Sequence, residues 1–170
     1  MADFRELIER DTREYSNLHR AVKESFKNRL NNLPAWEEAC EKFHAHQLKI
    51  DPYIDRVYDE ELVCQELQEF VITFLELDPM FFRSGYIKQV MLTKIKRAAL
   101  CETQKERLRK VVVSAVDQRP YREYRYYCHL AVKILNKKLL HAIEVIAREG
   151  EGARKSRAKY MCKHIEHVVV

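Results

Sequence analysis

Side chains near residue 40 have the types and spacing of metal ligands. Cys40, Glu41 and His44, with Glu37 one turn earlier, are separated by steps that place side chains on one face of a helix. Glu41-x-x-His44 has the Glu-x-x-His spacing of di-iron helical bundles, which need a second copy of that pair. Cys40, Glu41 and His44 are therefore the candidate metal ligands of this chain.

The rest of the sequence does not complete such a site. The nearest match to a second Glu-x-x-His is the reversed pair His141 and Glu144, and Cys162-x-His164-x-x-His167 could supply the other half of a zinc site. A Cys-x-x-Cys knuckle is missing throughout. We interpret these residues as surface imidazoles and small core thiols, and we expect neither a metal nor another cofactor.

Nucleophilic catalysis has weak support in the sequence. Cys128-His129 puts a thiol beside an imidazole, but adjacent side chains of a helix point apart. Cys128 falls in an apolar stripe, where a thiol is inert packing. Only three Gly are present, too few to suggest a glycine-rich phosphate loop. We expect a non-enzymatic protein, with a small helical enzyme or metalloprotein as the second alternative.

The formal net charge of +5 is unevenly distributed. Residues 1–79 hold 10 Lys and Arg against 18 Asp and Glu, whereas residues 80–170 hold 21 against 8. Such an asymmetry indicates a polyanionic partner, or oppositely charged surfaces that meet. Lys/Arg-rich helix faces that are simply solvated are the alternative interpretation.

The basic half also contains Tyr residues among its cations. Arg122, Tyr126, His129 and Lys133 follow one another at helical steps, so that a base could stack on Tyr126 between positive charges. We therefore predict a binding module whose basic half contacts a polyanion, with nucleic acid as the preferred class. The predicted contact residues are Lys94, Arg97, Arg107, Lys110, Arg122, Arg125, Tyr126, Arg154, Lys155 and Arg157.

The same charges permit a different partner. The acidic half, which includes Asp59-Glu60-Glu61, could meet the basic half of another copy, giving a self-associating protein–protein interaction adaptor. The two halves could also face each other within one molecule. The sequence leaves both arrangements open.

The elements that carry these residues are expected to be helices, because Gly and Pro are scarce and apolar residues recur at helical steps. Asp51-Pro52 and Pro34 mark helix starts. Thr103-x-x-Glu106 fits a capping box. The predicted helices span residues 3–31, 34–48, 51–77 with a possible break near Arg56, 84–98, 103–116, 121–148 with a possible kink at Asn136, and 153–167.

These elements predict an all-α fold, an antiparallel helical bundle or a short HEAT/armadillo-like helical-repeat stack of six to eight helices. The length suits a single helical domain over residues 1–170, with an acidic half and a basic half. No apolar stretch is long enough for a membrane helix or resembles a secretory signal. The five scattered Cys then fit reduced thiols in a cytoplasmic protein without membrane contact.

Overall fold

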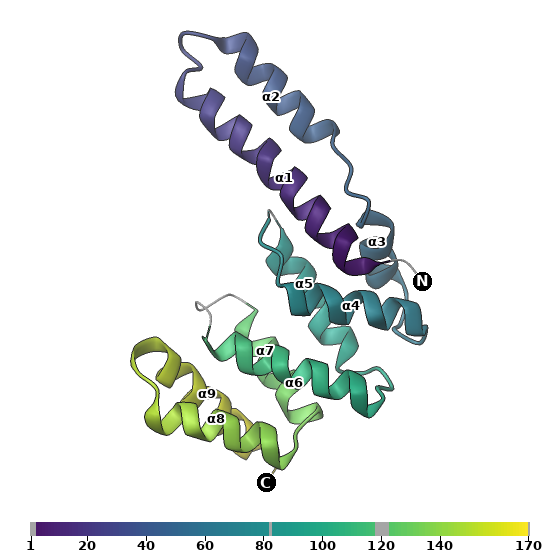
Figure 1. Cartoon of the computed structure of the whole chain (residues 1–170), viewed down its shortest axis with the longest axis vertical. Helices are drawn as coiled ribbons and strands as arrows, with labels where there is room; N and C mark the ends of the chain where they lie inside the picture. The colour runs from purple at the N-terminus through teal and green to yellow at the C-terminus, as the bar shows by residue number, and fades with distance from the viewer. Residues whose placement is uncertain (1–2, 82, 118–122, 170) are drawn as a thin grey trace.

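The computed structural model describes residues 3–81, 83–117 and 123–169 (Figure 1). Within these ranges the chain forms nine α-helices and no β-strand. The predicted all-α class is confirmed, and the number of helices exceeds the predicted six to eight. The helices are α1 (Phe4–Lys27), α2 (Leu33–Ala45), α3 (Asp51–Asp59), α4 (Gln65–Leu77), α5 (Ser84–Ile95), α6 (Glu102–Asp117), α7 (Tyr124–Lys133), α8 (Lys137–Glu149) and α9 (Gly152–Val169).

One additional helix arises because the predicted helix over residues 51–77 is interrupted between α3 and α4. Lys94 on α5 donates hydrogen bonds from Nζ to the backbone oxygens of Tyr58 (2.8 Å) and Glu60 (2.7 Å). These oxygens lie at the end of α3, where backbone carbonyls have no partner within the helix. A side chain distant in sequence therefore supplies hydrogen bonds to the free carbonyls at the end of α3.

The predicted helix over residues 121–148 is likewise two helices, of which α7 ends at Lys133 and α8 begins at Lys137. Asn136 is not a kink within a helix but the N-cap of α8, because its side-chain oxygen accepts the Leu139 N–H at 2.8 Å. Arg109 on α6 donates from Nε to the backbone oxygen of Ile134 at 2.8 Å. The apolar residues keep their helical spacing across this break, although the helix itself is interrupted there.

The start of α6 also differs from the predicted capping box. The helix begins at Glu102, and the Cys101 N–H donates to the side-chain oxygen of Gln104 at 3.1 Å. This is one of the two bonds of a capping box, and it lies two residues before the predicted Thr103 and Glu106. The Gln104 amide group is buried against α4, where it donates to Gln68 and Glu69, and this packing decides where the helix starts.

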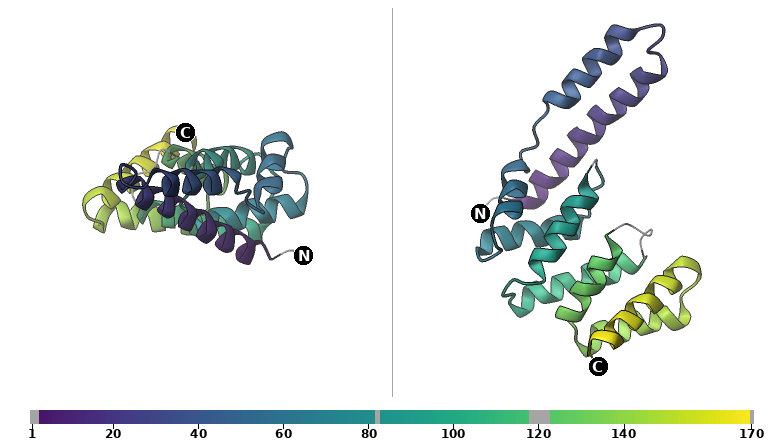
Figure 2. Two further views of the ribbon diagram at one scale, coloured as in Figure 1. Left: turned by 90° about the horizontal axis from the view of Figure 1, so that it is seen from above. Right: turned by 180° about the vertical axis from the view of Figure 1, so that it is seen from behind.

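The helices pack in two rows. In one row α1, α4, α6 and α8 contact one another in that order, and in the other α3, α5, α7 and α9 do so (Figures 1 and 2). Sequential neighbours α4 and α5, α6 and α7, and α8 and α9 pack as helical pairs that connect the rows. A continuous apolar core runs from Phe4 to Ile165.

The α1–α2 hairpin extends away from the other helices (Figures 1 and 2). We call residues 12–47 the arm, because no side chain in this range is buried. Apolar side chains at its end are open to solvent: Phe26 is 46% exposed, Leu33 48% and Leu30 92%. The arm therefore lacks the core that supports the rest of the chain.

The acidic and basic halves meet at specific ion pairs within the chain. Lys88 on α5 is fully buried and pairs with Asp78, which follows α4. Arg107 on α6 pairs with Glu69 and Glu76 on α4. Part of the charge asymmetry is thus balanced internally.

Candidate polyanion interface

Half of the predicted contact residues already bind groups of the protein. Three of these five join helices. Besides Lys94, they are Arg107, which donates to Glu69, Glu76 and Thr73, and Arg154, which pairs with Asp117. Their head groups hold helices together. They are poor choices for binding a phosphate, because that would break bonds that the fold uses.

Two more predicted residues act at helix ends. Lys155 donates from Nζ to the backbone oxygen of Arg148 at 2.9 Å, near the end of α8. Arg157 donates from Nε to the Val116 oxygen at 2.8 Å and from Nη2 to the Asp117 oxygen at 3.3 Å, at the end of α6. Cations at helix C-termini satisfy free carbonyls and favour the helix dipole.

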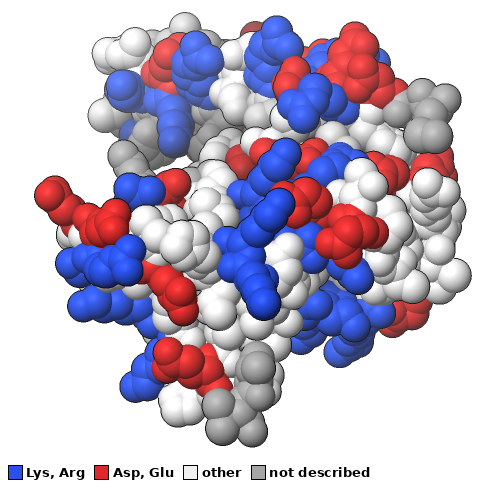
Figure 3. All heavy atoms as spheres, turned by 60° about the horizontal axis from the view of Figure 1, so that its bottom comes forward, with Lys and Arg blue, Asp and Glu red and all other residues white. Residues whose placement is uncertain are grey.

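The remaining predicted residues are not all on one surface. Arg97, Lys110 and Arg125 are exposed, and Tyr126 is half-buried against the core with the Arg125 guanidinium 5.9 Å from its ring centroid. Arg122 lies outside the described residues. Figure 3 shows Lys and Arg in separate groups with Asp and Glu between them on the face drawn there. On this face the positive charge is therefore interrupted by negative charge.

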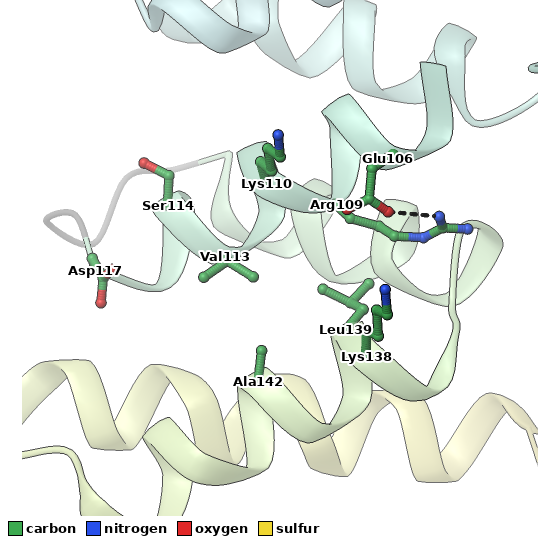
Figure 4. A pocket seen from close by; sticks show the side chains of 9 residues that line it. All are labelled: Glu106, Arg109, Lys110, Val113, Ser114, Asp117, Lys138, Leu139 and Ala142. Atoms are coloured by element: carbon green, nitrogen blue, oxygen red, sulfur yellow. Dashed lines mark hydrogen bonds and ion pairs between the residues drawn. The ribbon is translucent and has the colours of Figure 1, made fainter. Parts of the chain in front are cut away.

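Lys110 borders a groove between α6 and α8 (Figure 4). The groove has a volume of about 400 Å³ and an apolar floor that includes Val113 and Leu139, with Lys110 and Lys138 on opposite helices. Glu106 and Asp117 also line it. Arg109 lines it too and pairs with Glu106, so charges of both signs border the groove, which makes it a weaker anion site than a pocket with a purely basic lining.

A second pocket lies between the end of α5, α7 and α9, and its lining is strongly basic. We call it the basic pocket; its volume is about 500 Å³. Of the described residues that line it, none is Asp or Glu. The lining residues are Lys96, Arg97, His129, Val132, Lys133, His164 and Val168.

Two imidazoles meet in this pocket. His164 Nε2 lies 3.1 Å from His129 Nδ1, with the rings edge-to-face, so one ring donates a hydrogen bond and the other accepts it. The pKa of His129 is lowered by burial, then by the neighbouring His164, Lys96 and Arg125. The same positive potential that disfavours imidazolium would stabilise a bound anion.

Residues from α7, from α9 and from the end of α5 together line the basic pocket. On α7, His129 and Lys133 are one turn apart, as the predicted strip of Arg122, Tyr126, His129 and Lys133 required. His164 on α9, weighed in the sequence as part of a zinc site and interpreted as a surface imidazole, completes the imidazole pair. Lys96 was not among the predicted contacts, although its neighbour Arg97 was.

The predicted metal ligands do not form a site. No group of three or more His, Cys, Asp or Glu side chains within residues 3–81, 83–117 and 123–169 is arranged to hold a metal ion. Cys40 is partly buried on α2, whereas Glu41 and His44 are exposed. The Glu-x-x-His spacing therefore has no partner from another helix.

The cysteine next to the imidazole pair is not activated. Cys128 is fully buried in the core, and burial raises the pKa of its thiol to about 12. Its thiol therefore stays protonated and unreactive near neutral pH. The predicted role of Cys128 as packing agrees with this environment.

The chain matches no family model, no curated protein and no solved structure. Over the part of the chain that the structure describes, no helix is both long enough and apolar enough to cross a membrane.

Proposed function

We propose that this protein is a non-enzymatic binding module that contacts a polyanion, with nucleic acid as the preferred class, through the basic pocket. The observation that carries the proposal is the convergence of Lys96, Arg97 and Lys133 with two imidazoles, without a carboxylate in the described lining. Three cations that release counterions from a nucleic acid give salt-dependent affinity with little base specificity.

The contact set differs from the one expected from sequence. Arg97 lines the pocket, and Arg125 lies close enough to His129 to lower its pKa. A phosphate between Lys96, Arg97 and Lys133 could also accept a hydrogen bond from the imidazole pair. Tyr126, which is partly buried, sits beside Arg125 and offers a ring for contact with a base.

The two rows of helices support a short helical-repeat stack of the HEAT/armadillo type, in which successive pairs extend one surface. The basic pocket lies on the row formed by α5, α7 and α9. All five cysteines are free thiols, which supports a cytoplasmic location.

The test is a titration of the full chain against single- and double-stranded DNA and RNA at two salt concentrations. We expect binding that weakens as salt increases, with a slope of log affinity on log salt of about −2 for single strands if three cations each neutralise one phosphate. Affinity that does not change with salt, or no binding at low salt, would rule out the proposal.

Self-association is the second candidate function, and the arm favours it. Residues 12–47 contain no buried side chain, and Leu30 at the end of the hairpin is 92% exposed. A second copy that packed its arm alongside would bury these apolar side chains, as four-helix bundles do. Two arms related by a two-fold axis would present the same surface to each other.

Light scattering over a range of concentrations tests this candidate. A dimer would have twice the 20.4 kDa mass of the chain, and Leu30→Glu would make it dissociate. Val63→Glu is the matched control, because Val63 is 85% exposed and lies outside the arm. Trp36, the single Trp, lies on α2 and would show a blue-shifted emission in the dimer. A monomer at every concentration would contradict self-association.

A further inference from the structure

A separate cavity lies where the arm joins the rest of the molecule. It has a volume of about 710 Å³ and is lined from α1, the α2–α3 connection, α3, the α4–α5 connection and α5. This volume is typical of small-molecule sites. The polyanion proposal makes no use of this cavity.

Aromatic rings form much of the wall. Tyr15 and Phe81 lie with ring centroids 5.6 Å apart and planes at 60°, so they form two sides of a corner. Tyr58 and Tyr86 also line the cavity, and they are 46% and 54% exposed. Four aromatic side chains thus border a space that solvent can enter.

Carboxylates on α3 face the same space. Asp51 and Asp55 are one turn apart and both line the cavity. The Asp51 carboxylate accepts the Leu48 N–H at 2.9 Å, which fixes its position. Burial is the largest cause that raises the pKa of Asp51; the charges of Asp55 and Asp11 add to it, and the Leu48 hydrogen bond and His46 oppose it.

Positive charge is also present in the lining. Arg83 lines the cavity and lies near enough to Tyr15 to lower the pKa of its hydroxyl, against the larger opposite effect of burial. His46 is the other basic group of the described lining. Leaving His46 aside, the two aspartates outnumber Arg83 in the formal charge of the lining.

We propose that this cavity binds an organic ammonium ion, held by the Asp51 and Asp55 carboxylates and by the faces of the surrounding aromatic rings. Rings set at an angle can each present a face to one cation, and carboxylates add direct charge attraction. A bare metal ion fits less well, because the described side chains include no group of three suitable ligands here. The bulky methylated head of an ammonium ion instead matches a wide, aromatic-lined space.

The experiment is an NMR titration of the ¹⁵N-labelled full chain with choline chloride and with tetramethylammonium chloride, at ionic strength kept constant with sodium chloride. We expect saturable shifts of amides around Asp51, Asp55 and Tyr15. The neutral isostere of choline, 3,3-dimethyl-1-butanol, should bind about tenfold more weakly, because it keeps the shape and loses the charge. Equal affinity for the neutral isostere would overturn the proposal.

A pair of variants locates the effect. Asp55→Asn should weaken choline binding about tenfold, since it removes one carboxylate and keeps the side-chain shape. Asp59→Asn is the matched control, because Asp59 is also exposed on α3 but does not line the cavity. The two positions are on the surface, so neither change should disturb folding. Identical affinities in the two variants, or no saturable shifts in the wild type, would refute the site.

A peptide that contains trimethyllysine, titrated in the same way, identifies the source of the ammonium group. Tighter binding of the peptide than of choline would assign the site to a modified protein partner. Tighter binding of choline would assign it to a small molecule. Both results support an ammonium site, and failure of both ligands to bind contradicts it.

Discussion

Replacement of Arg107 by Ala should lower the free energy of unfolding without weakening binding to nucleic acid. The guanidinium donates to Glu76 through Nε and Nη2, at 2.8 Å each, and to Glu69 through Nη1. The Arg107 side chain is 30% exposed, and the carboxylates of Glu69 and Glu76 are 24% and 22% exposed. The variant would leave two half-buried carboxylates without their cation.

The magnitude lies between two known limits. Breaking a fully buried ion pair by removing one partner costs about 3–5 kcal/mol, whereas an exposed pair contributes about 0–1 kcal/mol. Because solvent screens this partly exposed position, we expect Arg107→Ala to lower the free energy of unfolding by about 2 kcal/mol. For a chain of 170 residues this corresponds to a decrease of roughly 4–8 °C in Tm.

Urea unfolding followed by circular dichroism measures this loss, and the slope with urea should stay unchanged. Lys105→Ala is the control, because Lys105 on the same helix makes only a 3.8 Å pair with the exposed Glu102 and should change stability by less than about 0.5 kcal/mol. A stable Arg107→Ala variant that binds nucleic acid poorly would refute the reasoning. It would show that Arg107 contacts phosphate, as the sequence alone suggested.

Three further predictions concern a helix cap, the thiols and the imidazole pair. Asn136→Ala should cost about 1 kcal/mol in urea unfolding, because it removes the cap of α8, and an unchanged midpoint would contradict that role. Cys64 should react first with a thiol reagent near neutral pH, because the Leu67 and Glu66 N–H groups at the start of α4 lower its pKa, while Cys128 should react only on unfolding; early labelling of Cys128 would show that the core opens there. The pKa of His129 is lower in the folded than in the unfolded state, so the free energy of unfolding should decrease as the pH falls through the ordinary His range, and His129→Gln should reduce that decrease; identical pH profiles of the two proteins would exclude this linkage.

The sequence was sufficient for the helical class and for several helix boundaries. Scarce Gly and Pro together with helical periodicity predicted an all-α fold, and Asp51-Pro52 correctly marked the start of α3. Local signals of this kind depend on residues a few positions apart. They are therefore visible without any knowledge of the tertiary structure.

The boundaries that the sequence missed depend on distant partners. Lys94 satisfies the end of α3, Arg109 the end of α7, and Gln104 fits against α4 at the start of α6. No local pattern records these contacts. The apolar stripe across residues 121–148 even favoured the wrong answer, since it keeps its phase through the break at Asn136.

The candidate site was only partly visible for the same reason. A count of cations cannot distinguish Arg157, which holds the carbonyls at the end of α6, from Lys133, which lines the basic pocket. The helical strip on α7 did predict that His129 and Lys133 lie together. Their partners Lys96 and His164 come from helices whose proximity to α7 is a property of the fold.

The most direct test of the polyanion proposal is the salt dependence of single-stranded RNA binding in two variants. Lys133→Ala removes a cation of the basic pocket, and Lys159→Ala removes an exposed cation of α9 outside it. We predict that Lys133→Ala reduces the salt slope by about 0.7, the value for one phosphate contact, and that Lys159→Ala leaves it unchanged. Equal slopes in both variants and the wild type would contradict the assignment of the basic pocket as the polyanion site.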